Sequence, residues 1–209
     1  MANKKNREIN LKNERDKKFR AACFKLRNFP IICLALSVLT ILLFLVNFAE
    51  VFNTDYGAEV KISGFNTFFA AITGQYTSEK AIFGNMAVPF NYYAESYVHT
   101  LGILTLIAVV LTLANLVVQI VNVATNTKNS ELNLISLILG VLQAGVLIAC
   151  FIVALSMKDA KILSTYCSGN PKCSIRSYAI IPAITALIGA AVSGIATVKY
   201  FIARKILKA

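Results

Sequence analysis

Four long apolar runs divide the chain, at residues 29–49, 101–123, 132–157 and 178–202. Each run has about the twenty residues needed to cross a hydrocarbon core about 30 Å thick. The first three contain no charged residue, and the fourth reaches its first charge, Lys199, close to its end. Because backbone groups in lipid must be satisfied within the segment, the pattern predicts four transmembrane helices.

A different pattern fills residues 50–100, between the first two runs. Apolar and other residues alternate over 56–62, the period of a half-buried strand. Residues 65–73 then carry apolar side chains at i, i+3, i+4 and i+7, which predicts a short amphipathic helix. Such a helix cannot span a bilayer, so it either lies in the interface or packs over the bundle mouth. The fold class is thus an all-α membrane protein: an antiparallel four-helix transmembrane bundle with a structured first outer loop.

Four shorter segments complete the chain: a basic tail over 1–28, a connection over 124–131, a second outer loop over 158–177 and a basic end over 203–209. The short connection predicts that the second and third helices form an antiparallel hairpin. The tail contains good helix formers. It is either a helix on the inner leaflet or a disordered tail that only fixes orientation.

Composition and charge agree with a membrane location. Apolar residues make up 57% of the chain and charged residues only 15%, against about 25% in soluble domains. With both termini in the cytoplasm, fifteen of the 21 Lys and Arg residues fall on the inner side, ten of them in residues 1–28. The net charge of +11 could indicate a nucleic-acid binder, but no basic, aromatic-interleaved fold accompanies it. Nucleic acid is therefore not expected as a partner. Neither outer loop contains an N-x-Ser/Thr sequon, which fits a bacterial plasma membrane.

Two cysteines lie close together in the second outer loop. Cys167 and Cys173 flank a Gly-Asn-Pro sequence that favours a turn. On the oxidising side of a membrane this pair predicts a disulfide. A metal site is the weaker alternative, because no further Cys or His cluster supplies ligands. We expect no metal and no cofactor.

The second span carries a polar stripe that recurs at helical spacing within an arc of about 100°. Unpaired amides are costly in hydrocarbon, so this face must turn toward partners or water. It either joins helices through hydrogen bonds or lines a path for water or substrate, with Gln143 on the third span as a candidate partner. The stripe consists of Thr105, Thr112, Asn115, Gln119 and Asn122.

Small residues form ridges on two spans and predict close helix packing, either within the bundle or between copies. The third span has Ser136, Gly140 and Ala144. The fourth span has two ridges, and within each ridge the small residues recur every four positions. One ridge contains Ala186, Ala190 and Gly194, and the other includes Gly189 and Ser193.

Nothing in the sequence indicates catalysis. The one histidine, His99, lies four residues after Glu95, a spacing typical of a local hydrogen bond, and no catalytic residue is assigned. The order of four spans with a long first outer loop is similar in outline to claudin-like proteins. The chain has no Trp and the first outer loop no Cys, so no family is assigned.

The functional hypothesis is a non-enzymatic interaction or assembly protein that uses its outer loop and its small-residue ridges. Its partners would be the lipid bilayer and another membrane protein or copies of itself. The alternative is an oligomeric channel or transporter component with a path along the polar stripe. The residues expected to bind a partner are the outer-loop aromatics Phe65, Phe68, Phe69, Tyr92, Tyr93 and Tyr97.

Overall fold

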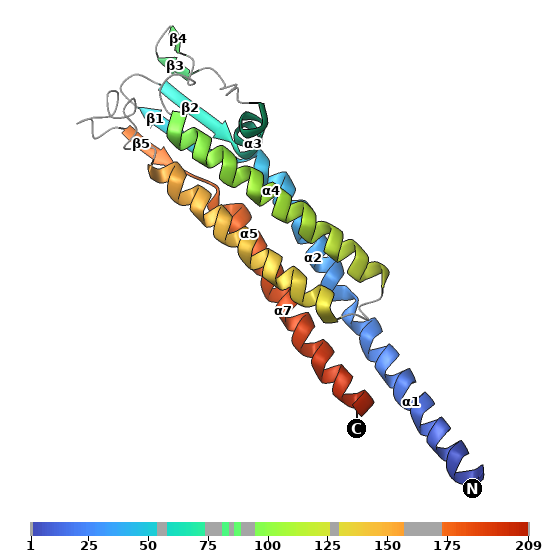
Figure 1. The fold of residues 1–209 in the computed structure, drawn as a ribbon. Helices are drawn as coiled ribbons and strands as arrows, with labels where there is room; N and C mark the ends of the chain where they lie inside the picture. Colours follow the sequence, from blue (N-terminus) through green and yellow to red (C-terminus); the bar gives the residue numbers. More distant parts are fainter. Residues whose placement is uncertain are drawn as a thin grey trace.

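A computed structural model of the chain describes residues 2–53, 58–73, 81–83, 86–88, 95–125, 130–156 and 173–208. The molecule is mostly helical, with small antiparallel sheets at one end (Figure 1). The helices are α1 (Ala2–Leu26), α2 (Asn28–Leu42), α3 (Gly64–Thr73), α4 (Glu95–Ala124), α5 (Ser130–Ser156) and α7 (Ile180–Lys208). The strands are β1 (Asn47–Asn53), β2 (Ala58–Ser63), β3 (Ala81–Phe83), β4 (Met86–Val88) and β5 (Cys173–Arg176).

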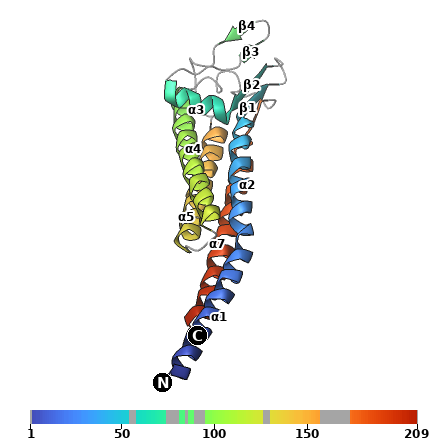
Figure 2. The ribbon, with the colours of Figure 1, turned by 90° about the vertical axis from the view of Figure 1, so that its right-hand side faces the viewer.

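Four helices form the bundle. Helix α2 packs against α4 and α7, and α5 packs against the same two helices, which closes a ring of four (Figures 1 and 2). Helices α4 and α5 run antiparallel, as the short connection predicts. The prediction of four long apolar helices is confirmed. The stretches long and apolar enough to cross a membrane are Asn10–Leu45, His99–Ala124, Glu131–Ser156 and Ile180–Lys205.

The predicted end of the first span, at residue 49, is wrong. Helix α2 stops at Leu42, a single 3₁₀ turn (η1, Leu43–Leu45) follows, and strand β1 begins at Asn47. The apolar run continues past the helix because Phe48 and Ala49, which belong to β1, are fully buried. An apolar run cannot by itself distinguish a helix end from a buried strand.

The larger sheet joins the two segments predicted as outer loops. Its strand order is β2-β1-β5, all antiparallel, with Val51 opposite Val60 on one side and Ile175 on the other. Strand β1 follows directly from α2, and β5 leads into α7. The strand predicted over 56–62 appears as β2, with residues 56 and 57 outside the described part of the chain. A separate hairpin pairs β3 with β4.

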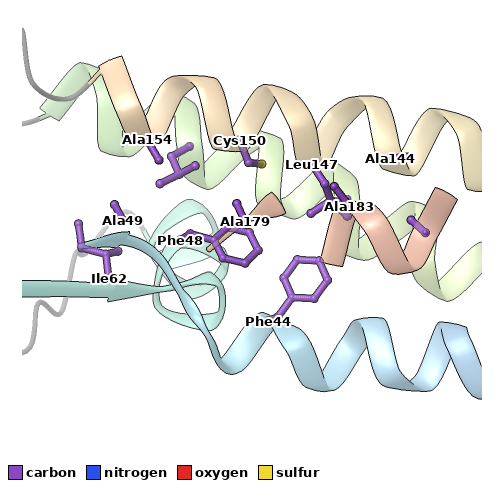
Figure 3. Close-up of a cluster of buried hydrophobic side chains, with 13 residues drawn as sticks. Phe44, Phe48, Ala49, Ile62, Ala144, Leu147, Cys150, Ala154, Ala179 and Ala183 are labelled. Carbon is purple, nitrogen blue, oxygen red and sulfur yellow. The ribbon is translucent and has the colours of Figure 1, made fainter. Parts of the chain in front are cut away.

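An apolar cluster fastens this sheet to the bundle. Figure 3 shows Phe44 of η1, Phe48 of β1 and Ile62 of β2 in one cluster with small residues of α5 and α7, among them Ala154 and Ala183. The Phe44 and Phe48 ring centroids lie 5.4 Å apart. The Ser177 hydroxyl donates a hydrogen bond of 2.6 Å to the Phe48 carbonyl, and the Tyr178 amide donates one of 3.1 Å to Asn47. We call the sheets together with α3 the cap.

Helix α3 is the short helix predicted over 65–73, and it packs on α4. Its contact with α4 uses small residues rather than the predicted apolar face. Thr67 is fully buried and its hydroxyl donates to Thr105 Oγ1 at 3.1 Å. Phe69 and Ile72 instead stay 54% and 58% exposed.

The contact between α3 and α4 is tight enough to be tested by one methyl group. A Cβ added at Gly102 would lie 2.9 Å from the Thr67 carbonyl oxygen and 3.3 Å from the Ala71 Cβ. We therefore expect Gly102→Ala to lower the free energy of unfolding by about 1–3 kcal/mol. Gly145→Ala is the matched control, since a Cβ there meets nothing within 4 Å. Chemical denaturation in detergent micelles would measure both; equal stabilities would contradict the close α3–α4 contact.

The N-terminal tail is helix α1, so the disordered interpretation of residues 2–26 is wrong. Helix α1 extends beyond the hairpin of α4 and α5 and continues approximately in the direction of α2 (Figure 1). Its second half packs against the end of α7, where the Phe19 and Tyr200 rings meet edge to face at 6.1 Å.

Candidate functional site

The polar stripe of α4 lies in the bundle interior. All five of its members, from Thr105 to Asn122, are buried, and each has at least one hydrogen-bonding group directed at another helix or at its own backbone. The Gln143 side chain of α5 donates a hydrogen bond of 2.7 Å to Thr112 Oγ1. Farther along, Asn122 Nδ2 donates to Asn133 Oδ1 at 2.6 Å. The stripe therefore holds α4 against α5.

Ser136 of α5 connects the stripe to the other half of the bundle. Its hydroxyl donates to Asn115 Oδ1 at 2.7 Å and accepts a hydrogen bond from Gln119 Nε2. The Ser193 hydroxyl of α7 lies 3.0 Å from Ser136 Oγ. Because a serine hydroxyl has one proton and that of Ser136 goes to Asn115, Ser193 is the donor in this contact.

The same connection reaches α2 through a thiol. Cys33 Sγ lies 3.3 Å from Ser193 Oγ and 3.5 Å from the Gly189 carbonyl. With the Ser193 proton directed at Ser136, the Cys33 thiol can donate to either of these oxygens. Hydrogen bonds thus run from α2 through α7 and α5 to α4. We call this set the polar layer: Cys33, Asn115, Gln119, Ser136 and Ser193.

Two acceptors next to this layer have no donor. Gln119 Oε1 and Asn122 Oδ1 are buried and lack a hydrogen-bond partner in the described part of the chain. A buried amide oxygen without a donor costs about 1–3 kcal/mol. A water molecule or a polar solute that donates a proton would satisfy each of them. This is the feature of the stripe that favours the path hypothesis.

The small-residue ridges are occupied within one chain. A Cβ at Gly140 would lie 3.0 Å from the Ala190 Cβ, so α5 and α7 pack here almost backbone to backbone. On the other α7 ridge, Thr185 Oγ1 lies 3.0 Å from Thr40 Oγ1 of α2. The ridge residues Ala186, Gly189, Ala190 and Ser193 are buried, and Gly194 is half-buried with its nearest contact at Leu137. These ridges are therefore not available to a partner.

The predicted cap aromatics have different environments. Phe65 is half-buried and its ring centroid lies 6.3 Å from that of Phe44, while Tyr97 packs partly buried against the same cluster. Phe68 and Phe69 meet edge to face at 5.3 Å on the outer side of α3, and Phe69 is more than half exposed. The two remaining members of the set, Tyr92 and Tyr93, lie outside the described residues.

The cysteine and histidine positions carry no assigned chemistry. Cys173 begins strand β5 opposite Asn53, whereas Cys167 lies outside the described residues, so the disulfide stays a prediction. Cys33 and Cys150 are buried free thiols. His99 is exposed near the start of α4. Among the described residues, no three His, Cys, Asp or Glu side chains gather as metal ligands would.

Sequence reasoning missed the central role of Ser136 and Ser193. Both were recognised only as small residues of packing ridges, although a serine in such a ridge can also donate a hydrogen bond across the interface. The signal was available, because Ser136 is the hydroxyl-bearing member of its ridge. Comparisons of the chain with known protein families, with curated proteins and with solved structures found no match.

Proposed function

We propose that this chain is a multi-pass membrane protein that works as a non-enzymatic interaction or assembly component through its cap. The reversed polarity of the bundle supports the membrane part of this proposal, and the exposed Phe69 and Ile72 of α3 support the interaction part. The bundle interior contains amides and hydroxyls, while every bundle helix exposes large aliphatic side chains. A soluble helix bundle has the opposite arrangement, with a charged outer face. On α4 the exposed residues are Ile103, Ile107, Val110, Leu113, Val117, Ile120 and Val121.

In the proposed orientation both termini lie in the cytoplasm and the cap lies outside, in the plasma membrane of a bacterium. The support is electrostatic: the basic ends of α1 and α7 leave the bundle at the end opposite to the cap (Figures 1 and 2). Retention of Lys and Arg on the cytoplasmic side is the general rule for such proteins.

The partner-binding surface of the cap is narrower than the full set of aromatics. Because Phe65 and Tyr97 help to fasten the cap, the outer face of α3, formed by Phe68, Phe69 and Ile72, is the part that can engage a partner. Helix α3 packs against α4, next to the exposed aliphatic band that begins at Ile103. A partner reaching both surfaces must itself lie in the membrane, so we propose another membrane protein or a second copy of this chain.

A path along the polar stripe is the second candidate. It is supported by the two buried acceptors, Gln119 Oε1 and Asn122 Oδ1. Against it, the other polar groups of the stripe are engaged in hydrogen bonds between the helices of one chain. Leucine replacements of Asn115, Gln119 and Asn122, with solute flux measured beside folding, separate the two candidates.

A photoreactive phenylalanine analogue at position 69 tests the proposed surface. We expect irradiation of membranes to give an adduct that is heavier than the chain by the mass of another protein or of a second copy. When two differently tagged chains are expressed together, an adduct that carries both tags identifies the second copy. Ile72→Ser should lower the yield roughly tenfold, because burial of such a side chain contributes about 1.5–3 kcal/mol.

Position 45 provides the matched control. Leu45 is 65% exposed on η1, so the analogue there should react with lipid and be insensitive to Ile72→Ser. Adducts with lipid alone at position 69 would contradict recognition through α3, while leaving the membrane location intact.

A further inference from the structure

Five basic residues lie on α1, on α7 and at the turn between α1 and α2, along the stretches that pack together through Phe19, Leu26 and Tyr200: Lys25, Arg27, Lys199, Arg204 and Lys205. We propose that this basic collar binds the phosphate-bearing headgroups of anionic phospholipids in the inner leaflet. The inference rests on the proposed membrane location and adds a lipid class and a binding surface to it.

Packing between the two ends of the chain brings these charges together. Leu26 and Tyr200 are buried against each other, with Phe19 and Phe29 packed around them. Lys199 Nζ lies 4.8 Å from the centroid of the Phe29 ring. Residues more than 170 positions apart in the sequence therefore contribute to a single positive region.

The collar residues come from acid-free stretches of the sequence, and the nearest acidic residue of α1 is Asp16, nine positions before Lys25. Residues 17–49 and 160–209 contain neither Asp nor Glu. Arg27 lies at the turn between α1 and α2, and its Nε is buried without a hydrogen-bond acceptor in the described part of the chain. The side chains of Lys25, Lys199, Arg204 and Lys205 are exposed. A phosphate group would supply the missing negative charge to the exposed members of the collar.

In the proposed membrane location, the collar also lies at the boundary between the hydrocarbon core and the lipid headgroups. The exposed aliphatic band of α7 continues through Ile195 and Val198 to Ile202, which is 59% exposed. Phe24 of α1 is 66% exposed next to Lys25. Aromatic and aliphatic side chains interleaved with Lys and Arg are typical of the boundary between hydrocarbon and headgroups. A soluble acidic protein or a nucleic acid would leave these apolar side chains without an apolar contact.

The basic residues in the first half of α1 provide a contrast. Lys12 is fifteen residues from Arg27, which corresponds to roughly 22 Å along a helix. The surface potential of a bilayer falls off within a Debye length of about 8 Å at physiological salt. The collar should therefore sense anionic lipid strongly, and Lys4, Lys5 and Lys12 only weakly.

The absence of Trp from the chain allows a direct measurement. Phe24→Trp places a single fluorophore beside the collar in the full-length protein, reconstituted into bilayers of phosphatidylcholine and phosphatidylglycerol. Brominated acyl chains, which quench Trp on contact, are carried by one lipid class at a time. We expect brominated phosphatidylglycerol to quench about tenfold more per molecule than brominated phosphatidylcholine, and added salt to reduce the difference.

Substitutions that neutralise basic residues, made in the Phe24→Trp background, identify which residues cause the preference for phosphatidylglycerol. Lys25→Gln, Arg27→Gln and Lys199→Gln together should bring the quenching ratio close to one. Lys4→Gln, Lys5→Gln and Lys12→Gln, which remove the same charge, should leave it unchanged. Arg204→Gln with Lys205→Gln provides a second collar variant at exposed positions, should the first fail to fold by circular dichroism.

The outcomes separate this inference from the proposed function. Equal quenching by the two brominated lipids would show a membrane-embedded protein without an anionic lipid site, and would overturn the collar alone. An equal loss of selectivity in the collar and distal variants would also overturn it, because net charge would then suffice. Quenching by neither lipid would place Phe24 away from the bilayer and overturn the collar, whereas failure of the protein to insert into the bilayers at all would contradict the membrane location itself.

Discussion

Ser136→Ala is expected to lower the free energy of unfolding by about 2 kcal/mol. The Ser136 hydroxyl joins three helices, through Asn115 and Gln119 of α4 and Ser193 of α7. Hydrogen bonds between membrane helices contribute about 0.6 kcal/mol each on average. Their loss also leaves buried polar groups without partners, which adds to the cost. Chemical denaturation in detergent micelles would measure the change.

Ser156→Ala is the matched control in the same helix. The Ser156 hydroxyl donates only to the Ile152 carbonyl of its own helix, at 2.9 Å. We expect a change within about 0.5 kcal/mol for this variant. Equal effects of the two substitutions would contradict the polar layer as a connection between helices.

Substitutions in the polar stripe of α4 distinguish a structural role of the stripe from a role in conduction. If the stripe only joins helices, replacing Asn115, Gln119 and Asn122 by Leu should impair folding or association without a specific change in permeability. If it lines a path, solute or ion flux into liposomes should fall while circular dichroism and elution volume stay unchanged. Loss of flux with folding intact would make the path the correct interpretation.

The spans and α3 could be predicted because their signals are local. A charge-free window of twenty residues, or Phe65, Phe68 and Ile72 at helical spacing, is contained within one segment. Strand β1 was missed because Phe48 and Ala49 extend an apolar run without interruption. Strand β5 has four residues and pairs with a strand about 120 positions earlier, so no local pattern indicates its partner.

The orientation of α3 and the polar layer depend on contacts between distant segments. The spacing of Phe69 and Ile72 identifies an apolar face, but Gly64 and Gly102 decide which face meets the bundle. A Cβ at Gly64 would lie 2.8 Å from the Phe48 ring, and only the small face of α3 permits that approach. The hydrogen bonds of Ser136 likewise require the registers of α4, α5 and α7 relative to one another. A single sequence contains no measure of those registers.

Gly140→Leu should be the most damaging single substitution in the bundle. A Cβ at Gly140 would lie 3.0 Å from the Ala190 Cβ, 3.3 Å from its Cα and 3.4 Å from its backbone nitrogen. Because two of these atoms are backbone, α7 cannot yield by changing a rotamer, and the helices must separate. The separation would also stretch the Ser136–Ser193 contact one turn away. We expect a loss of about 3 kcal/mol or more, and little folded protein in the membrane fraction.

Gly145→Leu makes the same chemical change five residues later. Apart from its chain neighbours and the nearby backbone of its own helix, no atom of the described residues lies within 4 Å of a Cβ built there, and the position is exposed. The variant should be unchanged or gain up to about 1 kcal/mol from the higher helix propensity of Leu. Both variants should be compared by denaturation midpoint and by yield of monodisperse protein. If the two lost stability equally, the cost would come from the helix surface generally. The Ser136, Gly140 and Ala144 ridge would then not be the contact that joins α5 to α7.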